Sequence, residues 1–201
     1  MAQRGSYAKG IAKREEILDK ALEVVAREGY RGASVKEIAD AVGLSQAGLL
    51  HYFDSKEELF TEILRKRDEV DSEYFASRFN VLHEADAIEK AYVALTRHNS
   101  EVPGLVHLFS QLAVDAADPQ HAAHEFFVER SLFLRSTFAE ALAQRELPEG
   151  TDVDVLARIF QAVSDGLQLQ WMLEGDVDMA GIIGTLFDLI VPQPAPSTAA
   201  D

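Results

Sequence analysis

The sequence predicts an all-α fold of about nine helices, and two observations support this prediction. Apolar residues recur every three to four positions through most of the 201-residue chain, and no segment alternates apolar and polar residues for long enough to form a sheet. The composition, 47% hydrophobic and 26% charged residues, is that of an ordinary globular protein. A chain of this length has room for one large domain or two small ones.

Cap and turn residues separate the first predicted helices. The first helix is expected to end at Gly29, a residue type that favours helix ends. Its apolar stripe consists of Ile17, Leu18, Ala21, Leu22 and Val25. Ser34 can cap a second helix, with Glu37 completing a capping box three residues later, and Gly43 ends that helix.

The other helices follow by the same reasoning. A third helix, capped by Ser45, is predicted to run to about Tyr52, and a long fourth helix covers residues 56–79. The remaining helices are expected over residues 86–102, 104–117, 120–146, 152–174 and 177–191. Residues 192–201 carry no apolar periodicity, and we expect this tail to be disordered.

Charge is unevenly distributed along the chain. The formal net charge of −15 at first sight argues against a nucleic-acid partner. However, residues 1–67 hold 12 of the 19 Lys and Arg residues and 11 of the 34 Asp and Glu residues, so residues 68–201 carry −16. The basic N-terminal arm contains Arg4, Lys9, Lys13 and Arg14 and no acid. This distribution indicates two parts with different roles, although the arm could also be a solvated tail.

The sequence contains no cysteine and no recognisable signal peptide or membrane span, which limits the chemistry and the compartment we expect. The absence of cysteine excludes disulfide bonds, cysteine nucleophiles and thiolate metal sites. The start of the chain lacks the apolar core of a signal peptide, and no apolar run approaches the roughly 18 residues of a membrane span. We therefore expect a soluble cytoplasmic protein with no membrane partner.

Residues 34–53, SVKEIADAVGLSQAGLLHYF, have the spacing of a helix-turn-helix. Ala39 is small enough to let the second helix approach, and Gly43 can adopt the left-handed backbone of the turn. The apolar residues at the crossing are Ile38, Val42, Leu44, Leu49 and Phe53. The outward positions are short or hydrogen-bonding, as suits a helix in a major groove. An ordinary helical hairpin with a polar face is the alternative.

The segment GLSQAGLLHYFDSKEELF, followed by a long helix, resembles the recognition helix and fourth-helix start of TetR-type transcriptional regulators. The preceding segment REEILDKALEVVAREGYRGASVKEIADAVG matches the rest of that N-terminal domain, from about residue 12. VSDGLQLQWMLEGDVDMAGIIGTLFDLI more loosely resembles the family's last two helices, which form its dimer interface. The resemblance implies a helix-turn-helix DNA-binding domain over residues 1–55 and a ligand-binding and dimerisation domain over residues 56–191.

The resemblance also implies where DNA is contacted. Lys56 matches the family's phosphate contact at the start of the fourth helix, whereas Leu50 stands where many members carry a tyrosine. Leu50 either removes that contact or offers an apolar surface to a thymine methyl group. Gln46 and His51 have the reach to read bases, and glutamine prefers adenine. The predicted DNA-binding residues are Arg14, Ser34, Lys36, Ser45, Gln46, Ala47, Gly48, His51, Tyr52 and Lys56.

Two apolar stripes near the C-terminus fit either a simple monomer core or a homodimer interface, and the resemblance implies the homodimer interface. The predicted interface residues are Leu156, Phe160, Val163, Leu167, Met179, Ile182, Ile183, Leu186, Phe187 and Ile190. Gly181 and Gly184 each cost the last helix about 1 kcal/mol relative to alanine, which suggests close helix contact there. A two-fold dimer implies a pseudo-palindromic operator.

Aromatic residues with polar neighbours in the middle helices favour a small-molecule site, which is usually apolar with a few polar anchors. The resemblance implies such a site. The predicted ligand-binding residues are Phe75, Tyr92, His107, Gln111, Phe127, Gln168 and Trp171. Packing in the core or at the surface is the alternative for each of them.

Catalysis and metal binding find little support in the sequence. No catalytic motif is present, and we predict no catalytic residue, cofactor or metal. His121 and His124 could place two metal ligands on one helix face, but surface histidines are more common at this spacing. The hypothesis is a homodimeric transcriptional regulator, most simply a repressor that a small molecule releases from operator DNA. A sensing protein without DNA binding and a small α-helical enzyme are the alternatives.

Overall fold

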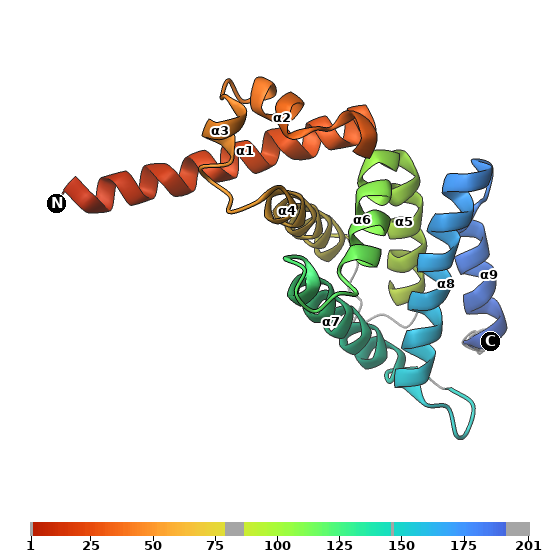
Figure 1. The fold of residues 1–201 in the computed structure, drawn as a ribbon. Coiled ribbons are helices and arrows are strands. Elements are labelled where there is room, and N and C mark those ends of the chain that lie inside the picture. Colours follow the sequence, from red (N-terminus) through yellow and green to blue (C-terminus); the bar gives the residue numbers. More distant parts are fainter. Residues whose placement is uncertain (1, 79–86, 146, 192–201) are drawn as a thin grey trace. The chain divides into compact units, whose positions relative to one another are not determined.

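The computed structural model describes residues 2–78, 87–145 and 147–191, and within these ranges the chain forms nine helices and no strand (Figure 1). The helices are α1 (Ala2–Gly32), α2 (Val35–Ala41), α3 (Gln46–Leu49), α4 (Lys56–Ala76), α5 (Ala87–Glu101), α6 (Pro103–Asp115), α7 (His124–Leu142), α8 (Val153–Glu174) and α9 (Met179–Ile190). The predicted all-α class is confirmed. No helix of this described part is long and apolar enough to span a membrane. The predicted disordered tail, residues 192–201, lies outside the described residues.

The described residues divide into two compact units, each with its own apolar core. Residues up to 72 and residues 99–129 form the first unit, and residues 73–98 and those from 130 onward form the second. Most of α4 therefore packs with α1, α2, α3 and α6, while α5, α8, α9 and most of α7 form the second unit. The predicted boundary at residue 55 concerns function rather than packing, and it stays a prediction.

The core of the first unit joins helices that are distant in the sequence. Helix α1 packs against α2 and α6, and α2 packs against α3. The buried apolar side chains include Ile17, Leu18, Ala21, Val25, Ile38, Leu49, Phe53, Leu59, Ile63, Leu64, Leu105, Leu108, Leu112 and Phe126. Helices of 7 and 4 residues, such as α2 and α3, are too short to be stable alone. Burial of their apolar faces in this core is what holds them in place.

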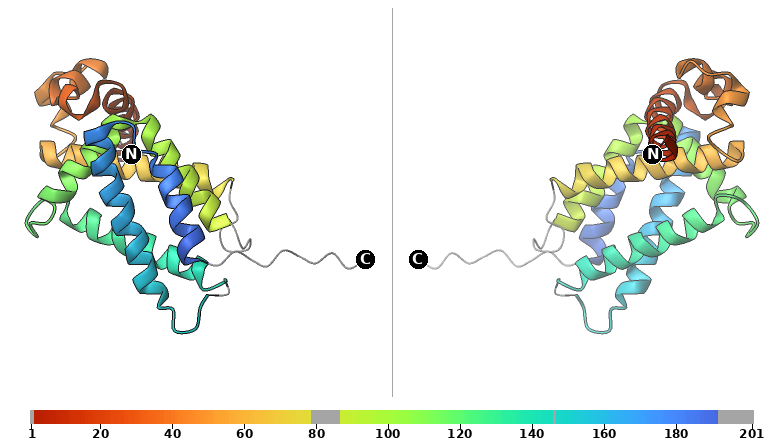
Figure 2. Two further views of the ribbon diagram at one scale, coloured as in Figure 1. Left: turned by 90° about the vertical axis from the view of Figure 1, so that its right-hand side faces the viewer. Right: turned by 90° about the vertical axis from the view of Figure 1, so that its left-hand side faces the viewer.

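The core of the second unit is built from α5, α7, α8 and α9. Its buried apolar side chains include Ile88, Phe138, Ala139, Leu142, Leu156, Phe160, Leu167, Met179, Ile183 and Phe187. Helices α8 and α9 pack side by side (Figure 2). Gly175 ends α8 with a left-handed φ of 76°, and the Asp178 side chain caps the start of α9.

Helix α1 is longer than predicted at both ends. It begins at Ala2, so the backbone of the predicted basic arm is helical, and it continues through Gly29 to Gly32. The predicted end at Gly29 is wrong because glycine permits a helix end without imposing one. Ala33 is fully buried, which places the turn toward α2 after Gly32.

Several other predicted helix ends also differ. Helix α6 ends at Asp115 rather than near residue 117, and α9 begins at Met179 rather than at Val177. Helix α3 ends at Leu49 rather than near Tyr52, whose amide donates to the Leu49 carbonyl in a turn. Helix α7 begins at His124 rather than near residue 120, because the Asp118 carboxylate accepts from the Gln120 amide at 2.9 Å and starts a turn there.

Helix α4 ends at Ala76 rather than near residue 79, and α7 ends at Leu142 rather than near residue 146, because the residues that follow each helix form a turn or bend. The start predicted near residue 86 lies outside the described residues.

Candidate functional site

Helices α2 and α3 cross as a helix-turn-helix (Figure 1). Gly43 in the connecting turn has a φ of +69°, which glycine adopts without strain. The Leu44 amide donates to the Ala39 carbonyl at 2.9 Å and closes the turn. Ala39, Ile38 and Leu49 are fully buried. The predicted helix-turn-helix is confirmed.

Side-chain caps begin both helices of the motif. At α2 the Ser34 hydroxyl accepts from the Glu37 amide at 3.3 Å, and the Glu37 carboxylate accepts from the Ser34 amide at 2.8 Å, which confirms the predicted capping box. Hydrogen bonds from the Ser34 hydroxyl and amide lower the pKa of Glu37. At α3 the Ser45 hydroxyl accepts from the Gly48 amide at 3.0 Å. A Cβ at Gly48 would lie only 3.2 Å from the Ser45 oxygen, so a glycine there favours this cap.

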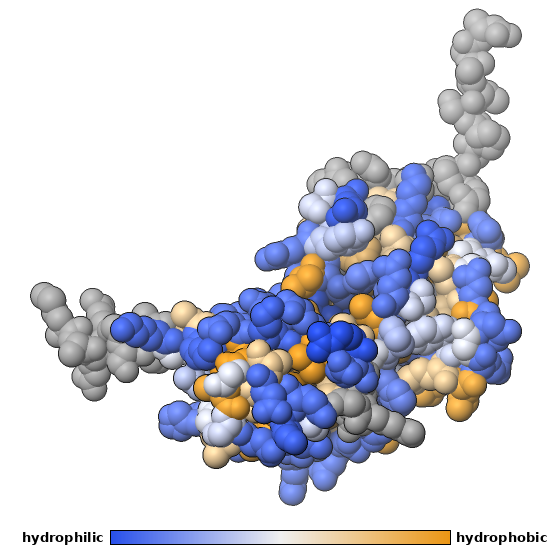
Figure 3. Space-filling model, turned by 90° about the horizontal axis from the view of Figure 1, so that it is seen from above, coloured by the Kyte–Doolittle hydropathy of each residue, from blue (hydrophilic) through white to orange (hydrophobic). Residues whose placement is uncertain are grey.

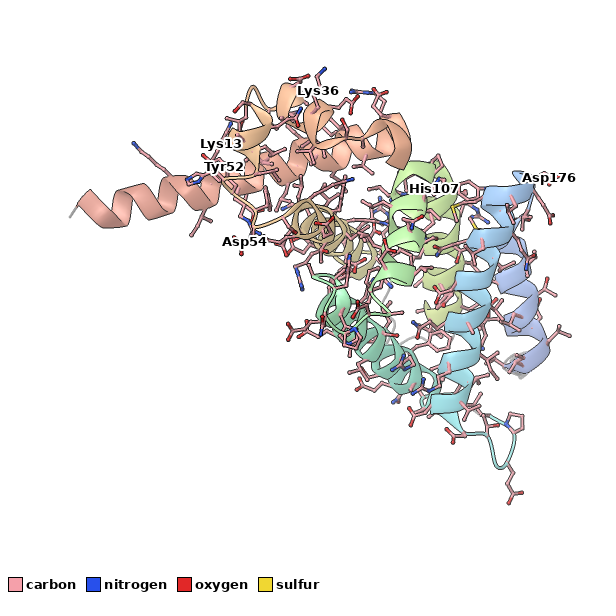
Figure 4. All side chains as sticks on the ribbon, in the orientation of Figure 1. Lys13, Lys36, Tyr52, Asp54, His107 and Asp176 are labelled. Atoms are coloured by element: carbon pink, nitrogen blue, oxygen red, sulfur yellow. The ribbon has the colours of Figure 1, made fainter. Side chains whose placement is uncertain are left out.

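Most of the predicted DNA-binding residues lie on the outside of the motif. Ser34, Lys36, Ser45, Gln46, Ala47, His51 and Lys56 are exposed, and Gly48 and Tyr52 are partly buried. Figure 3 shows the side on which α2 and α3 lie, where hydrophobic residues form small groups among hydrophilic ones. Figure 4 labels Lys36 on α2 and Tyr52 after α3. Because α3 is only 4 residues long, His51 and Tyr52 belong to the loop that follows it.

Lys56 and Leu50 are both accessible at the ends of this loop. Lys56 begins α4, and its ammonium lies 5.5 Å from the centroid of the Phe60 ring. Leu50 caps the C-terminus of α3 with an exposed apolar side chain. The rings of His51 and Tyr52 between them lie 6.0 Å apart, edge to face. The loop therefore presents a cation, an imidazole and an apolar group to the outside.

Arg14 is held by side chains of the first unit rather than projecting freely. One guanidinium nitrogen donates to the Glu58 carboxylate at 2.9 Å, and the other lies 3.3 Å from the Glu62 carboxylate. The guanidinium carbon lies 4.7 Å from the centroid of the Phe53 ring. The sequence predicted Arg14 as a DNA contact. It did not predict the pairing with Glu58, because Glu58 is 44 residues away in the sequence.

A second charged bridge joins α1 to α4. The Lys66 ammonium donates to the Glu15 carboxylate at 3.1 Å and lies 3.6 Å from Asp19 and 3.7 Å from Glu69. The hydrogen bond to Glu15 raises the pKa of Lys66. The helix that precedes the motif and the helix that follows it are thus linked at two points, Arg14 and Lys66.

The interior of the second unit combines an aromatic cluster with a polar pair. The ring centroid of Tyr92 on α5 lies 5.2 Å from that of Phe138, 5.9 Å from Phe160 and 6.0 Å from Phe187. The Tyr92 and Ser164 hydroxyl oxygens lie 3.0 Å apart in a hydrogen bond. Burial raises the pKa of Tyr92 to about 12. A polar group in apolar surroundings, which a small-molecule site requires, is therefore present at Tyr92.

Further polar side chains lie on α7 and α8 near this pair in the sequence. Asp165 follows Ser164, and although its side chain retains exposed surface, desolvation raises its pKa while Arg130 opposes that rise. One turn earlier, Gln161 donates to the Ser131 hydroxyl at 2.7 Å and accepts from Arg135 at 3.2 Å. These residues were not predicted from the sequence, because their partners lie on different helices.

The predicted ligand-binding residues are divided between the two units. Phe127, His107 and Gln111 lie in the first unit, where Phe127 packs 5.1 Å from the Phe109 ring and Gln111 is exposed. Phe75, Tyr92, Gln168 and Trp171 lie in the second unit, where Tyr92 and Trp171 pack against the core. Tyr92 also forms the part-buried hydrogen bond with the Ser164 hydroxyl.

The predicted dimer interface needs a correction. The structure places Leu156, Phe160, Leu167, Met179, Ile183 and Phe187 in the core of the second unit, and Val163, Leu186 and Ile190 pack against that core. A fully buried side chain has no surface left to bury against a second copy. Ile182, which is 42% exposed, is the one member of the predicted set that retains a large accessible apolar surface.

The two glycines of α9 have different explanations. The Asp178 carboxylate caps the helix by accepting from the Gly181 amide at 2.9 Å, and a Cβ at Gly181 would collide with that carboxylate. A Cβ at Gly184 would lie 3.9 Å from a methyl group of Val93 on α5, at ordinary contact distance. The sequence suggested close helix contact at both glycines, and the structure gives other reasons. Gly181 leaves room for the Asp178 cap, and Gly184 faces α5 of the same unit at ordinary contact distance.

The two histidines weighed as metal ligands have backbone partners. A ring nitrogen of His124 hydrogen-bonds to the Ala116 carbonyl at 2.8 Å, and His121 accepts from the Ala123 amide at 3.2 Å. Within the described ranges no group of three or more His, Cys, Asp or Glu residues is arranged to hold a metal ion.

An exposed helix-turn-helix within an all-α chain is the architecture of a DNA-binding transcriptional regulator. A profile of the bacterial regulatory proteins of the tetR family matches residues 17–63, which run from α1 through the motif into α4. Over this segment the chain is similar to the tetR family of bacterial regulatory proteins.

Individual relatives resemble the chain to different extents. The HTH-type transcriptional repressor KstR2 of Rhodococcus jostii (strain RHA1) is 47% identical over 53 residues, which is 26% of this chain and 26% of that repressor. The fatty acid metabolism regulator protein of Bacillus subtilis (strain 168) is 23% identical over 183 residues, 88% of this chain and 92% of the relative. The crystal structure of AibR in complex with isovaleryl coenzyme A and operator DNA shares the fold, with a TM-score of 0.59 and 23% identity over 90% of this chain and 100% of that one.

Proposed function

We propose that this chain is a repressor that binds operator DNA as a homodimer and is released by a small-molecule effector. The helix-turn-helix with an exposed outer face carries the proposal. The match to KstR2, which is called a repressor, and the structure of AibR with both isovaleryl coenzyme A and operator DNA support it. A regulator of this kind acts on the chromosome, in the cytoplasm of a bacterial cell.

In this proposal α3 enters the major groove and the residues around it divide the work. Gln46, exposed on the first turn of α3, reads a base, with adenine preferred because glutamine can pair with it bidentately. His51 in the following loop is the second candidate base reader, and Leu50 offers its exposed surface to a thymine methyl group. Lys56 at the start of α4 contacts a phosphate.

The dimer would form through the faces of α8 and α9 that the core leaves exposed. Val155, Ile159, Leu169 and Leu173 follow one another on α8 at i, i+4, i+14 and i+18, and Leu173 is 86% exposed. Ala162 and Gly166 lie on the same stripe, and Ile182 and Leu189 occupy the matching face of α9. Exposed apolar stripes of this kind mark interaction sites. A two-fold axis between two such faces places two recognition helices on two half-sites of a pseudo-palindromic operator.

The effector would bind in the second unit, at the polar pair inside the aromatic cluster. The hydroxyls of Tyr92 and Ser164 can exchange their mutual hydrogen bond for one to a ligand, and the neighbouring phenyl rings supply apolar contact. Release from DNA requires only that the effector bind more tightly to a conformation whose recognition helices no longer match the half-sites.

An electrophoretic mobility shift with the DNA upstream of the chain's own gene tests the proposal, at several stated salt concentrations because phosphate contacts make binding salt-dependent. A sequence-specific complex containing two copies of the chain is expected. A Gln46→Ala/Lys56→Ala double variant that folds normally is the matched control, and it should lose the specific complex. Failure of the purified dimer to form a specific complex with any fragment of the genome would refute DNA-binding regulation and favour a sensing protein without DNA.

A further inference from the structure

Arg14 connects α1 to the start of α4 through a part-buried set of contacts. Its guanidinium pairs with Glu58 at 2.9 Å and with Glu62 at 3.3 Å. The Arg14 side chain is 33% exposed, so the pairs are partly shielded from water. Two carboxylates on successive turns of α4 therefore share one cation from α1.

Glu58 also organises the loop between α3 and α4. Its amide donates to the Ser55 hydroxyl at 3.0 Å, which caps α4, and its carboxylate accepts from the Asp54 amide. The two oxygens of the Glu58 carboxylate thus have different partners: one accepts from the loop backbone and the other accepts from Arg14. The position of this carboxylate sets where the loop ends and α4 begins.

Phe53, in the loop, supplies the third contact of Arg14. Its side chain is 2% exposed and anchors the loop in the core of the first unit, with the Arg14 guanidinium 4.7 Å from the ring centroid. Cation–aromatic contacts of this kind are attractive and hold both groups in place. His51 and Tyr52 directly precede Phe53 in the sequence, and Lys56 follows it by three residues.

We propose that Arg14 is a positioning residue, which clamps the loop after the recognition helix through Glu58 and Phe53 and does not itself contact phosphate. The inference deepens the proposed function and rests on it, because the clamped residues are the proposed DNA contacts. Arg14 also neutralises Glu58 and Glu62, whose negative charges would otherwise repel the DNA backbone. Loss of the clamp leaves the contact residues present but less well placed.

Two substitutions separate this role from a phosphate contact. Arg14→Ala removes the cation, and Glu58→Gln keeps an acceptor for the Asp54 amide while it weakens the pair with Arg14. Lys13→Ala is the matched control, since Lys13 is a neighbouring cation of α1 that pairs with Glu16 at 2.8 Å. Binding of a natural or selected operator is measured as a function of salt for all three variants and the unmodified chain.

The clamp predicts that Arg14→Ala and Glu58→Gln each weaken specific binding by about five- to tenfold, the effect of losing partly exposed ion pairs and a cation–aromatic contact. The salt slope of Glu58→Gln should be unchanged. A phosphate contact predicts a different pattern. Arg14→Ala would lower the salt slope by about one, and Glu58→Gln, which removes a negative charge, would bind as tightly as the unmodified chain or more tightly. That second pattern would overturn the proposal.

Hydrogen exchange at the Asp54 amide tests the clamp without DNA. Arg14→Ala should speed exchange at Asp54, whereas Lys13→Ala should leave it unchanged, with both variants folded by circular dichroism. If the unmodified chain binds no operator, the proposed function fails, but the exchange rates still decide whether Arg14 holds the loop. Equal exchange in Arg14→Ala and the unmodified chain would overturn the clamp even if DNA binding is confirmed.

Discussion

Substitution of Gly43 by alanine isolates the cost of the left-handed turn between α2 and α3. Gly43 has a φ of +69°, and a Cβ built there meets no atom within 4 Å, so the substitution causes no collision. The remaining cost is that of an L-residue in the left-handed region, about 1–2 kcal/mol. Alanine also restricts the unfolded chain, which recovers about 0.4–1 kcal/mol. We therefore expect a net loss of about 1 kcal/mol in the free energy of unfolding.

Thermal and denaturant unfolding measure this loss, which corresponds to about 2–4 °C in Tm for a chain of this size. Gly43→Asn is the first control and should lose less, because asparagine tolerates the left-handed region. Gly10→Ala in α1 is the second control. A Cβ at Gly10 also meets no atom within 4 Å but lies in a regular helix, so this substitution should stabilise by about 0.5–1 kcal/mol. Equal stability of Gly43→Ala and the unmodified chain would refute the reasoning.

Four further outcomes follow from the structure and the proposed function. Lys56→Ala should weaken binding to all DNA sequences alike and lower the salt slope by about one, and a loss confined to one base position would contradict the phosphate contact. Gln46→Ala should relax the preference at one base pair per half-site, at a cost of about 1–3 kcal/mol, measured by selection from random DNA; an unchanged preference excludes Gln46 as a base reader. Leu169→Asp on the exposed stripe of α8 should give monomers in analytical ultracentrifugation, whereas the control Leu132→Asp, on the exposed surface of α7, should not. The pKa of Tyr92 is raised to about 12 in the folded chain, so the unfolded chain loses the hydroxyl proton at lower pH, and the free energy of unfolding should fall as pH rises from about 10 to 12. Tyr92→Phe should make that fall shallower in denaturant titrations. An unchanged fall would contradict burial of the Tyr92 hydroxyl.

The helix-turn-helix was predictable because its determinants are local. The Ser34–Glu37 capping box, the Ser45 cap and the glycine turn each depend on residues within a few positions of one another. Their spacing in the sequence therefore specifies the same contacts in the folded chain. The exposed position of Gln46 followed from the apolar positions of the same short helix.

The contacts of Arg14 were not predictable, because a lone arginine in a basic segment carries no record of its partner. Glu58 lies on a different helix 44 residues away, and only the packing of α1 against α4 brings the two together. The same reason applies to Tyr92 and Ser164, which are separated by 72 residues. Pairs of this kind depend on the tertiary arrangement and leave no periodic signal.

Local caps, turn residues and apolar spacing were enough to predict the helix-turn-helix and the presence of the other helices, because each of these signals involves residues close together in the sequence. Only the tertiary structure decided which apolar face of α8 is core and which is free. Phe160 and Leu167 lie on one face, and Ile159 and Leu169 lie on another, so apolar spacing alone cannot distinguish them. The packing of α5, α7 and α9 covers the first face and leaves the second exposed, and this choice depends on contacts between helices that are distant in the sequence.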